Sequence, residues 1–145
     1  MTRRFLPIAA IVAASIASTA ALVAVPVLAQ TCVQVEVQNV RPDAGMVMVA
    51  AYSEAAAFRK TPVVATQMKA AAATMTVPLC GLTGTSVALA LYQDLNGNGK
   101  LDANAFGIPS EPWGVSGTTM PMTGPSWESS MVPLDGRTIV VKLST

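Results

Sequence analysis

The chain has 145 residues, of which 52 % are hydrophobic and 12 % charged, and its formal net charge is +1. Removal of an N-terminal segment that contains Arg3 and Arg4 would leave 116 residues with seven basic and eight acidic side chains, a net charge of −1. A nearly neutral chain of this size is not built to hold nucleic acid or anionic lipid by charge, and it suffices for one domain but not two. Histidine is absent from the sequence, which excludes Ser-His-Asp triads and the usual zinc sites.

Residues 1–29 have the pattern of a cleaved export signal. An apolar, Ala-rich run from Phe5 to Val25 follows the two arginines, and Val27-Leu28-Ala29 supplies modest or small residues before the cleavage position. We expect cleavage between Ala29 and Gln30, which leaves residues 30–145 as one exported domain, periplasmic or extracellular. A retained membrane anchor is the alternative, and the arginine pair leaves the twin-arginine route open. No other segment is apolar and long enough to span a bilayer.

Cys32 and Cys80 both lie after the expected cleavage position. An even pair of cysteines in an exported chain predicts a disulfide. Closing a loop of roughly fifty residues would stabilise the fold by about 4 kcal/mol in the chain-entropy model. A lipid anchor on Cys32 is not expected, because Thr31 stands where a lipoprotein signal has a small residue.

In chain order, the first predicted elements are strands. Valines alternate with polar residues over residues 33–38, the two-residue period of a strand with one buried face. Residues 41–45 predict a turn and residues 46–52 a buried strand, so we expect a hairpin. Residues 53–58 predict a helical turn after Ser53.

The remaining elements are also mostly strands. Residues 61–75 combine helix-favouring Ala with strand-favouring Val and Thr, and we interpret them as one or two strands. Further strands are expected over residues 74–79, 86–93, 126–132 and 138–143. About seven short strands predict an all-β fold, an antiparallel β-sandwich of immunoglobulin-like or transthyretin-like type. Residues 94–125 form an unusually long Asn/Gly-rich loop, and such loops are commonly functional.

The start of this loop reads Asp-Leu-Asn-Gly-Asn-Gly-Lys-Leu-Asp. Its oxygen-bearing side chains recur along a glycine-rich curl, the spacing by which a short loop wraps a hard cation such as Ca²⁺. An Asn/Gly-rich turn held by side-chain hydrogen bonds, without metal, is the alternative. The predicted ligands are the side chains of Asp94, Asn96, Asn98 and Asp102 and the backbone carbonyl of Lys100.

The loop differs from an EF-hand in two ways. A strand pattern precedes it where an EF-hand has a helix, and Ala105 stands where an EF-hand has its bidentate Glu. We expect Glu111 to fold back and supply the missing carboxylate; a solvated glutamate is the alternative. Few carboxylates and neutral Asn ligands predict modest calcium affinity, which suffices outside the cytoplasm.

Trp113, between Pro112 and Gly114, is a candidate ligand contact. If exposed, it would offer a platform to a sugar ring or a peptide; if buried, it would close one end of the core, which we favour. Trp127 is expected in the core as well.

Two stretches, Gly84 to Asp102 and Phe106 to Gly114, resemble a bacterial exported family called domain of unknown function 2141. Gly45 to Tyr52 resembles that family's leading strand region, so the resemblance extends from about Val33 to Leu143. The resemblance implies an exported β-sandwich with no assigned activity.

The predicted side-chain ligands and Glu111 match the family's motif positions. This chain departs from the family at Gln93, where the resemblance implies His, and at Val115, where it implies an aromatic residue. The absence of that His weakens any enzymatic interpretation.

The sequence therefore predicts a noncatalytic binding or structural module whose loop, organised by calcium, faces an envelope protein or a glycan. A carboxylate-dependent glycan hydrolase of the cell envelope is one alternative, because Asp94, Asp102 and Glu111 lie close in sequence. A structural module whose loop binds nothing is the other.

Overall fold

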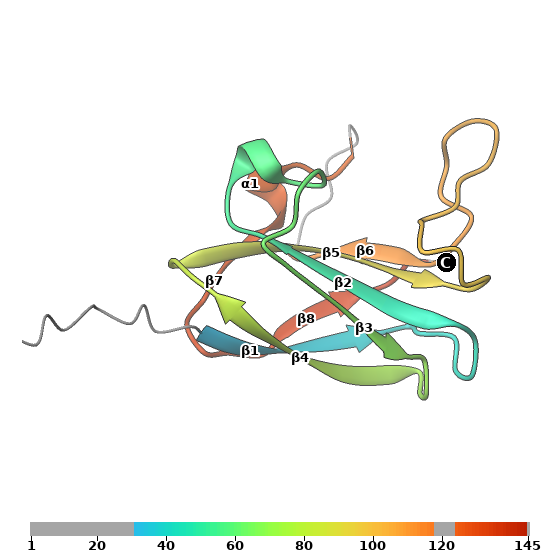
Figure 1. Cartoon of the computed structure of the whole chain (residues 1–145), viewed down its shortest axis with the longest axis horizontal. Helices are drawn as coiled ribbons and strands as arrows, with labels where there is room; N and C mark the ends of the chain where they lie inside the picture. Colours follow the sequence, from blue (N-terminus) through green and yellow to red (C-terminus); the bar gives the residue numbers. More distant parts are fainter. Residues whose placement is uncertain (1–30, 118–123, 145) are drawn as a thin grey trace, which may run out of the picture.

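The computed structural model describes residues 31–117 and 124–144, so the predicted export signal and its cleavage position lie outside the described residues. The described residues form eight strands in two facing layers, with two short helices (Figure 1). The strands are β1 (Thr31–Gln38), β2 (Met46–Tyr52), β3 (Val64–Lys69), β4 (Thr74–Leu82), β5 (Ser86–Asp94), β6 (Trp113–Val115), β7 (Met131–Pro133) and β8 (Ile139–Lys142). The helices are the 3-10 helix η1 (Ala55–Ala57) and α1 (Trp127–Ser130).

The strands divide between a three-stranded and a five-stranded sheet. In the first, the order is β4-β1-β8, with β4 antiparallel and β8 parallel to β1. In the second, the order is β3-β2-β5-β6, β7 also pairs with β5, and all pairs are antiparallel. Two mainly antiparallel sheets packed face to face confirm the predicted all-β sandwich.

Alternating valines explain how the two sheets meet. Val33, Val35 and Val37 of β1 and Val47 and Val49 of β2 belong to one buried cluster, and each is at most 3 % exposed. The two-residue period gives each strand one apolar face, and facing layers bury both. Burying one such side chain stabilises the fold by roughly 1.5–3 kcal/mol.

The prediction of a hairpin between residues 33–38 and 46–52 is wrong. β1 pairs with β4 and β8, whereas β2 pairs with β3 and β5 in the other sheet. The connection between the two strands crosses the sandwich, and Gln93 of β5 holds it there. The Gln93 amide bonds to the backbone N–H and C=O of Arg41 and to the C=O of Ala44.

The strand expected over residues 126–132 is wrong in its first half. Residues 127–130 form α1, and a strand begins only at residue 131. A reciprocal capping box starts the helix: the Ser126 Oγ accepts the Ser129 N–H at 3.2 Å, and the Ser129 Oγ accepts the Ser126 N–H at 3.1 Å.

The two short helices cover one end of the outer face of the five-stranded sheet (Figure 1). Tyr52 and Phe58 meet edge to face with ring centroids 5.4 Å apart, and Phe58 and Trp127 do so at 6.3 Å. Trp127 therefore packs against a small second cluster outside the main core.

The other expected elements are present with shifted ends. The helical turn expected over residues 53–58 is η1, residues 61–75 contain β3 and the start of β4, and residues 138–143 contain β8. Among the helices of the described residues, none has the length and apolar character needed to cross a membrane.

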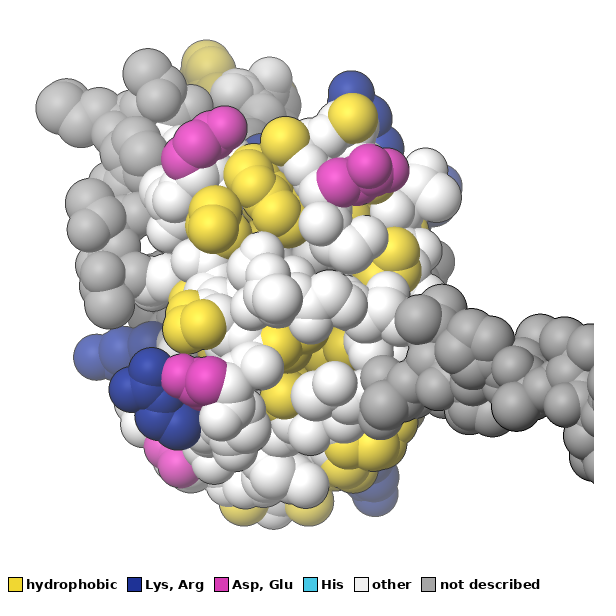
Figure 2. All heavy atoms as spheres, turned by 90° about the vertical axis from the view of Figure 1, so that its left-hand side faces the viewer, with side chains coloured by type: hydrophobic (Ala, Val, Ile, Leu, Met, Phe, Trp, Pro, Cys, Tyr) yellow, Lys and Arg dark blue, Asp and Glu magenta, His cyan; other side chains and the backbone are white. Residues whose placement is uncertain are grey.

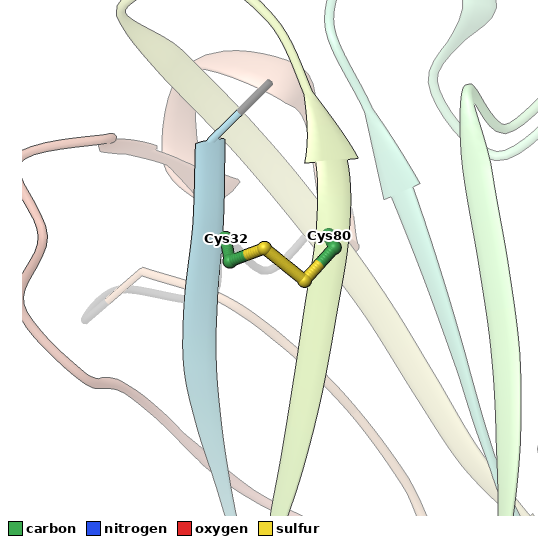
Figure 3. Close-up of a disulfide and its surroundings, with 2 residues drawn as sticks. All are labelled: Cys32 and Cys80. Carbon is green, nitrogen blue, oxygen red and sulfur yellow. A yellow bond between two sulfur atoms is a disulfide. The ribbon is translucent and has the colours of Figure 1, made fainter. Parts of the chain in front are cut away.

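A disulfide between Cys32 and Cys80 links β1 to β4 (Figure 3). It confirms the predicted pairing and closes a sequence separation of 48 residues. Both cysteines are exposed, on the outer side of the three-stranded sheet, so the bond adds a covalent link without occupying core volume.

Candidate metal-binding loop

Residues 94–111, hereafter the Asp94 loop, connect β5 to β6 and project from one end of the sandwich (Figure 1). Asp94 is the last residue of β5, pairs with Met46 of β2 and is 3 % exposed. Gly45 passes so close that a Cβ there would lie 1.9 Å from the Asp94 carbonyl oxygen, and its φ is +66°. The chain needs glycine at this point to bring the two strand ends together.

The Asp94 carboxylate organises the first turn of the loop. Its Oδ1 accepts the N–H of Gly97 at 2.7 Å and of Asn98 at 3.2 Å, and its Oδ2 accepts the N–H of Gly99 at 2.7 Å. Burial raises the pKa of Asp94, but backbone N–H groups of residues 96–99 outweigh that effect and hold the pKa below its ordinary value. Asp94 is therefore an ionised carboxylate at neutral pH.

Asn96, Asn98 and Asp102 converge on one another. The Nδ2 atoms of Asn96 and Asn98 donate to the two Asp102 carboxylate oxygens at 2.6 and 2.9 Å. The Oδ1 atoms of the two asparagines accept the backbone N–H groups of Asn98 and Lys100 at 3.1 and 2.8 Å. Three predicted ligand side chains thus lie together, and Lys100 contacts them through its backbone N–H, whereas the predicted ligand was its carbonyl.

Glu111 returns to the loop from its far end. It is 6 % exposed; its Oε1 accepts the Leu95 N–H at 2.8 Å, and its Oε2 accepts the Asp102 N–H at 3.0 Å. One carboxylate therefore ties together the beginning, middle and end of the loop.

The donor chemistry suits a hard cation, because the gathered side chains offer carboxylate and amide oxygens without nitrogen or sulfur ligands. The arrangement is nevertheless dominated by internal hydrogen bonds. Amide nitrogens, not oxygens, face Asp102. In the described part of the chain, no group of three or more His, Cys, Asp or Glu residues is placed to hold a metal ion. Rotation of the two Asn amides by 180° would turn their oxygens toward Asp102. It would also aim their NH₂ groups at the backbone N–H of Asn98 and Lys100, so the curl would have to rearrange around an ion.

Sequence reasoning did not identify the projecting tip of the loop. An isolated bridge joins Ala103 to Pro109, and the Asn104 Oδ1 accepts the N–H groups of Phe106 and Ile108 at 2.9 and 3.1 Å. Phe106 is 88 % and Ile108 59 % exposed. The Asn104-to-Gly107 spacing is a turn signal that would have indicated this hairpin-like tip.

Trp113 lies beside the Asp94 loop, not in the main core. It is partly buried, sits opposite Tyr92 of β5, and lines a hollow of about 210 Å³ with Arg41, Ile108 and Ser144 among others. Burial raises the pKa of Tyr92, and the negative charges of Asp94 and Glu111 raise it further.

Gln93 occupies the position at which the resemblance implied a histidine. It is fully buried, and its three hydrogen bonds all go to backbone atoms of the connection between β1 and β2. The side chain at this position therefore fastens a neighbouring turn.

These features define an all-β protein with a carboxylate- and asparagine-lined loop at one end of its sandwich. A family model described as "Uncharacterized protein conserved in bacteria (DUF2141)" matches residues 35–142. The chain belongs to this family, as the resemblance indicated. No curated protein and no solved structure matches the chain.

Proposed function

We propose that this protein is an exported, noncatalytic β-sandwich, a binding or structural module whose Asp94 loop is organised by Ca²⁺. The observation that carries the proposal is one hydrogen-bonded curl of backbone that involves the carboxylates of Asp94, Asp102 and Glu111. The Asp94 and Glu111 carboxylates accept backbone N–H groups of the curl, and Asp102 accepts the side-chain amides of Asn96 and Asn98. The curl holds oxygen donors from both ends of the loop, which is what a cation with six to eight oxygen ligands requires.

Charge favours a cation at this position. Asp94, Asp102 and Glu111 bring three carboxylates into one loop, where Lys100 is the single basic residue. Like charges in a partly buried turn repel one another, and a divalent ion offsets that repulsion. Residues 96–100 are exposed and lack apolar packing, so hydrogen bonds and the ion would hold their shape.

The same contacts support a noncatalytic role. Both Glu111 oxygens accept backbone N–H groups, which orients the carboxylate toward the loop and away from solvent. A carboxylate-dependent hydrolase needs one free carboxyl to protonate a leaving group. Glu111→Gln would abolish turnover of an envelope polysaccharide under that alternative, and would change loop stability and calcium affinity under ours.

Export and the partner rest on other features. The Cys32–Cys80 disulfide suits an oxidising compartment, and the residue pattern of positions 1–29 suits a signal peptide. The partner would be an envelope protein or a glycan, with Trp113 and the hollow beside it as a contact surface.

Calcium titration by isothermal calorimetry, paired with thermal unfolding with and without chelator, tests the proposal. Calcium at ten times its Kd would stabilise the fold by about 1.4 kcal/mol. Asp94→Asn should abolish both signals. Asp43→Asn is the matched control, because Asp43 is exposed, lies outside the loop and has a φ of +58°, which Asn also tolerates. Absence of heat and of a thermal shift in the unmutated protein would refute the metal.

A further inference from the structure

The two sheets touch along one side through a short antiparallel bridge between Trp113 of β6 and Ser144, two residues past the end of β8. Trp113 donates its N–H to the Ser144 oxygen at 3.3 Å, and Ser144 donates its N–H to the Trp113 oxygen at 2.8 Å. A Cβ on Gly114 would lie 2.8 Å from the Lys142 oxygen, so the strands remain close here. Continued in this register, the bridge would place Gly117 opposite Val140.

The pairing between the two sheets does not continue to Gly117. This glycine has a φ of +91°, and a Cβ on it would lie 2.1 Å from the Ser129 oxygen, so the backbone has turned toward α1. Beyond the bridge lies a cleft of about 430 Å³ between β7 and β8. Its walls are Gly117, Val132, Pro133, Asp135, Arg137, Thr138, Ile139 and Val140.

The walls of the cleft carry backbone groups that no neighbouring strand uses. Leu143 donates its N–H to the oxygen of Gln38, the last residue of β1, whereas Ser144 faces Trp113 on the opposite side. Strand alternation therefore directs the N–H and C=O of Val140 away from β1. On β7, Leu134 donates to Thr85, so the C=O of Pro133 points away from β5. Within residues 31–117 and 124–144, β8 pairs with β1 alone and β7 with β5 alone.

We infer that this cleft binds an extended segment of another polypeptide, which adds a strand to the free edge of β8. Unpaired N–H and C=O groups on a strand edge match an extended backbone, whose alternate side chains then face the interior. Val132, Pro133 and Ile139 make the cleft mainly apolar, and Val140 is 51 % exposed. The segment would therefore carry small apolar side chains at every second position.

Size and charge agree with this ligand. The unpaired edge from Thr138 to Val140 is three residues long, which is about 10 Å at roughly 3.3 Å per residue. This length has room for three or four residues of an extended peptide. The two charged groups at the rim, Asp135 and Arg137, pair with each other, so the cleft selects no net charge. Figure 2 views the end of the molecule that lies opposite the Asp94 loop, and apolar side chains there show between uncharged polar atoms. The cleft is independent of the proposed calcium loop.

The test uses the exported chain without its signal and a capped peptide, acetyl-Thr-Val-Thr-Val-Thr-Val-amide, whose residues favour strands. We expect saturable amide shifts in NMR spectra at Gly117 and Val140 and slower hydrogen exchange of the Val140 amide. The amides of Gly97 and Gly99 should not change. Absence of saturable shifts at millimolar peptide would overturn the inference. Protection of the Val140 amide in the protein without peptide would overturn it too, because the chain itself would then cover the edge.

A pair of variants sharpens the result. Val140→Pro removes an N–H that points away from β1, so the ladder to β1 keeps its bonds while the free edge is blocked. Peptide binding should weaken roughly tenfold or more. Val140→Thr keeps the N–H and the branched shape and should bind as the unmutated protein does. If Val140→Pro does not fold, the exchange measurement on the unmutated protein decides alone.

Discussion

The backbone N–H of Asp102 donates to Glu111 Oε2 at 3.0 Å, although the two residues are nine positions apart. The contact closes the base of the projecting tip, because Ser110 also donates its N–H to the Asp102 oxygen at 2.8 Å. Glu111 simultaneously accepts the Leu95 N–H at the start of the loop. A single buried side chain therefore ties the start of the connection between β5 and β6 to its middle and its end.

Replacing Glu111 by Gln should destabilise the fold by about 1–3 kcal/mol, because an amide NH₂ would face one of the two backbone N–H donors. Calcium affinity should fall as well. Urea unfolding gives the first quantity and calorimetry the second. Glu54→Gln is a suitable control, since Glu54 is exposed and its side chain makes no capping bond. Equal unfolding free energies for the two variants would contradict the role assigned to Glu111.

Asp94 should make the free energy of unfolding fall at acid pH. Its pKa in the folded state lies below the ordinary value of 3.8, so the charged form is stabilised by folding. That contribution is fully present above the unfolded-state pKa and is lost as the pH falls through the lower folded-state pKa. Unfolding curves recorded from neutral pH down to acid should show a loss of stability that Asp94→Asn lacks. A parallel loss in the variant would show that other carboxyls cause it.

Gly45→Ala should be among the most damaging single changes. The added Cβ would overlap the Asp94 carbonyl oxygen at 1.9 Å, and the φ of +66° adds strain. We expect a loss above about 2 kcal/mol in chemical unfolding, because clash and strain combine. Gly84→Ala shares a positive φ of +93° but meets no atom within 4 Å, so it should cost only about 1 kcal/mol. Similar losses in both variants would mean that the contact of Gly45 with Asp94 has little weight.

Removal of the disulfide should weaken the fold without destroying it. Cys32 and Cys80 are exposed, so a double Ser variant opens no cavity in the core. The loss expected from the freer unfolded chain is about 2–4 kcal/mol. Unfolding of the oxidised protein, of the reduced protein and of the double variant measures it. The last two should agree, and a reduced protein as stable as the oxidised one would contradict the estimate.

The sequence pattern predicted local elements better than their partners. The alternating valines of β1 and the run ending at Asp94 each specify a strand, because burial of one face is encoded within a few residues. Strand pairing is not encoded in this way. No local pattern indicates that residues 39–45 cross between the sheets. There they bond to the Gln93 side chain, about fifty positions later in the sequence.

The same limit applies to the loop. The glycine-rich curl brings the side chains of Asn96 and Asn98 onto Asp102, whereas Asp94 contacts the curl through backbone N–H groups. That the four side chains bind a metal stays a prediction. The placement of Glu111 needed a guess about how a long loop folds back, and the exposed tip at Phe106 was missed because its shape comes from Asn104 hydrogen bonds. At Ser126, a capping box outweighed a strand-like pattern.

Parallel pairing of β1 with β8 has a consequence for the order of assembly. The first and last strands of the described fold are neighbours, and the Asn39 side chain reaches the Leu143 carbonyl across 104 positions. A nascent chain can join β1 to β4 early, but one flank of β1 stays bare until residues 139–142 arrive. The sandwich therefore stays incomplete until those residues have emerged, and an intermediate arrested earlier would offer that bare flank to chaperones.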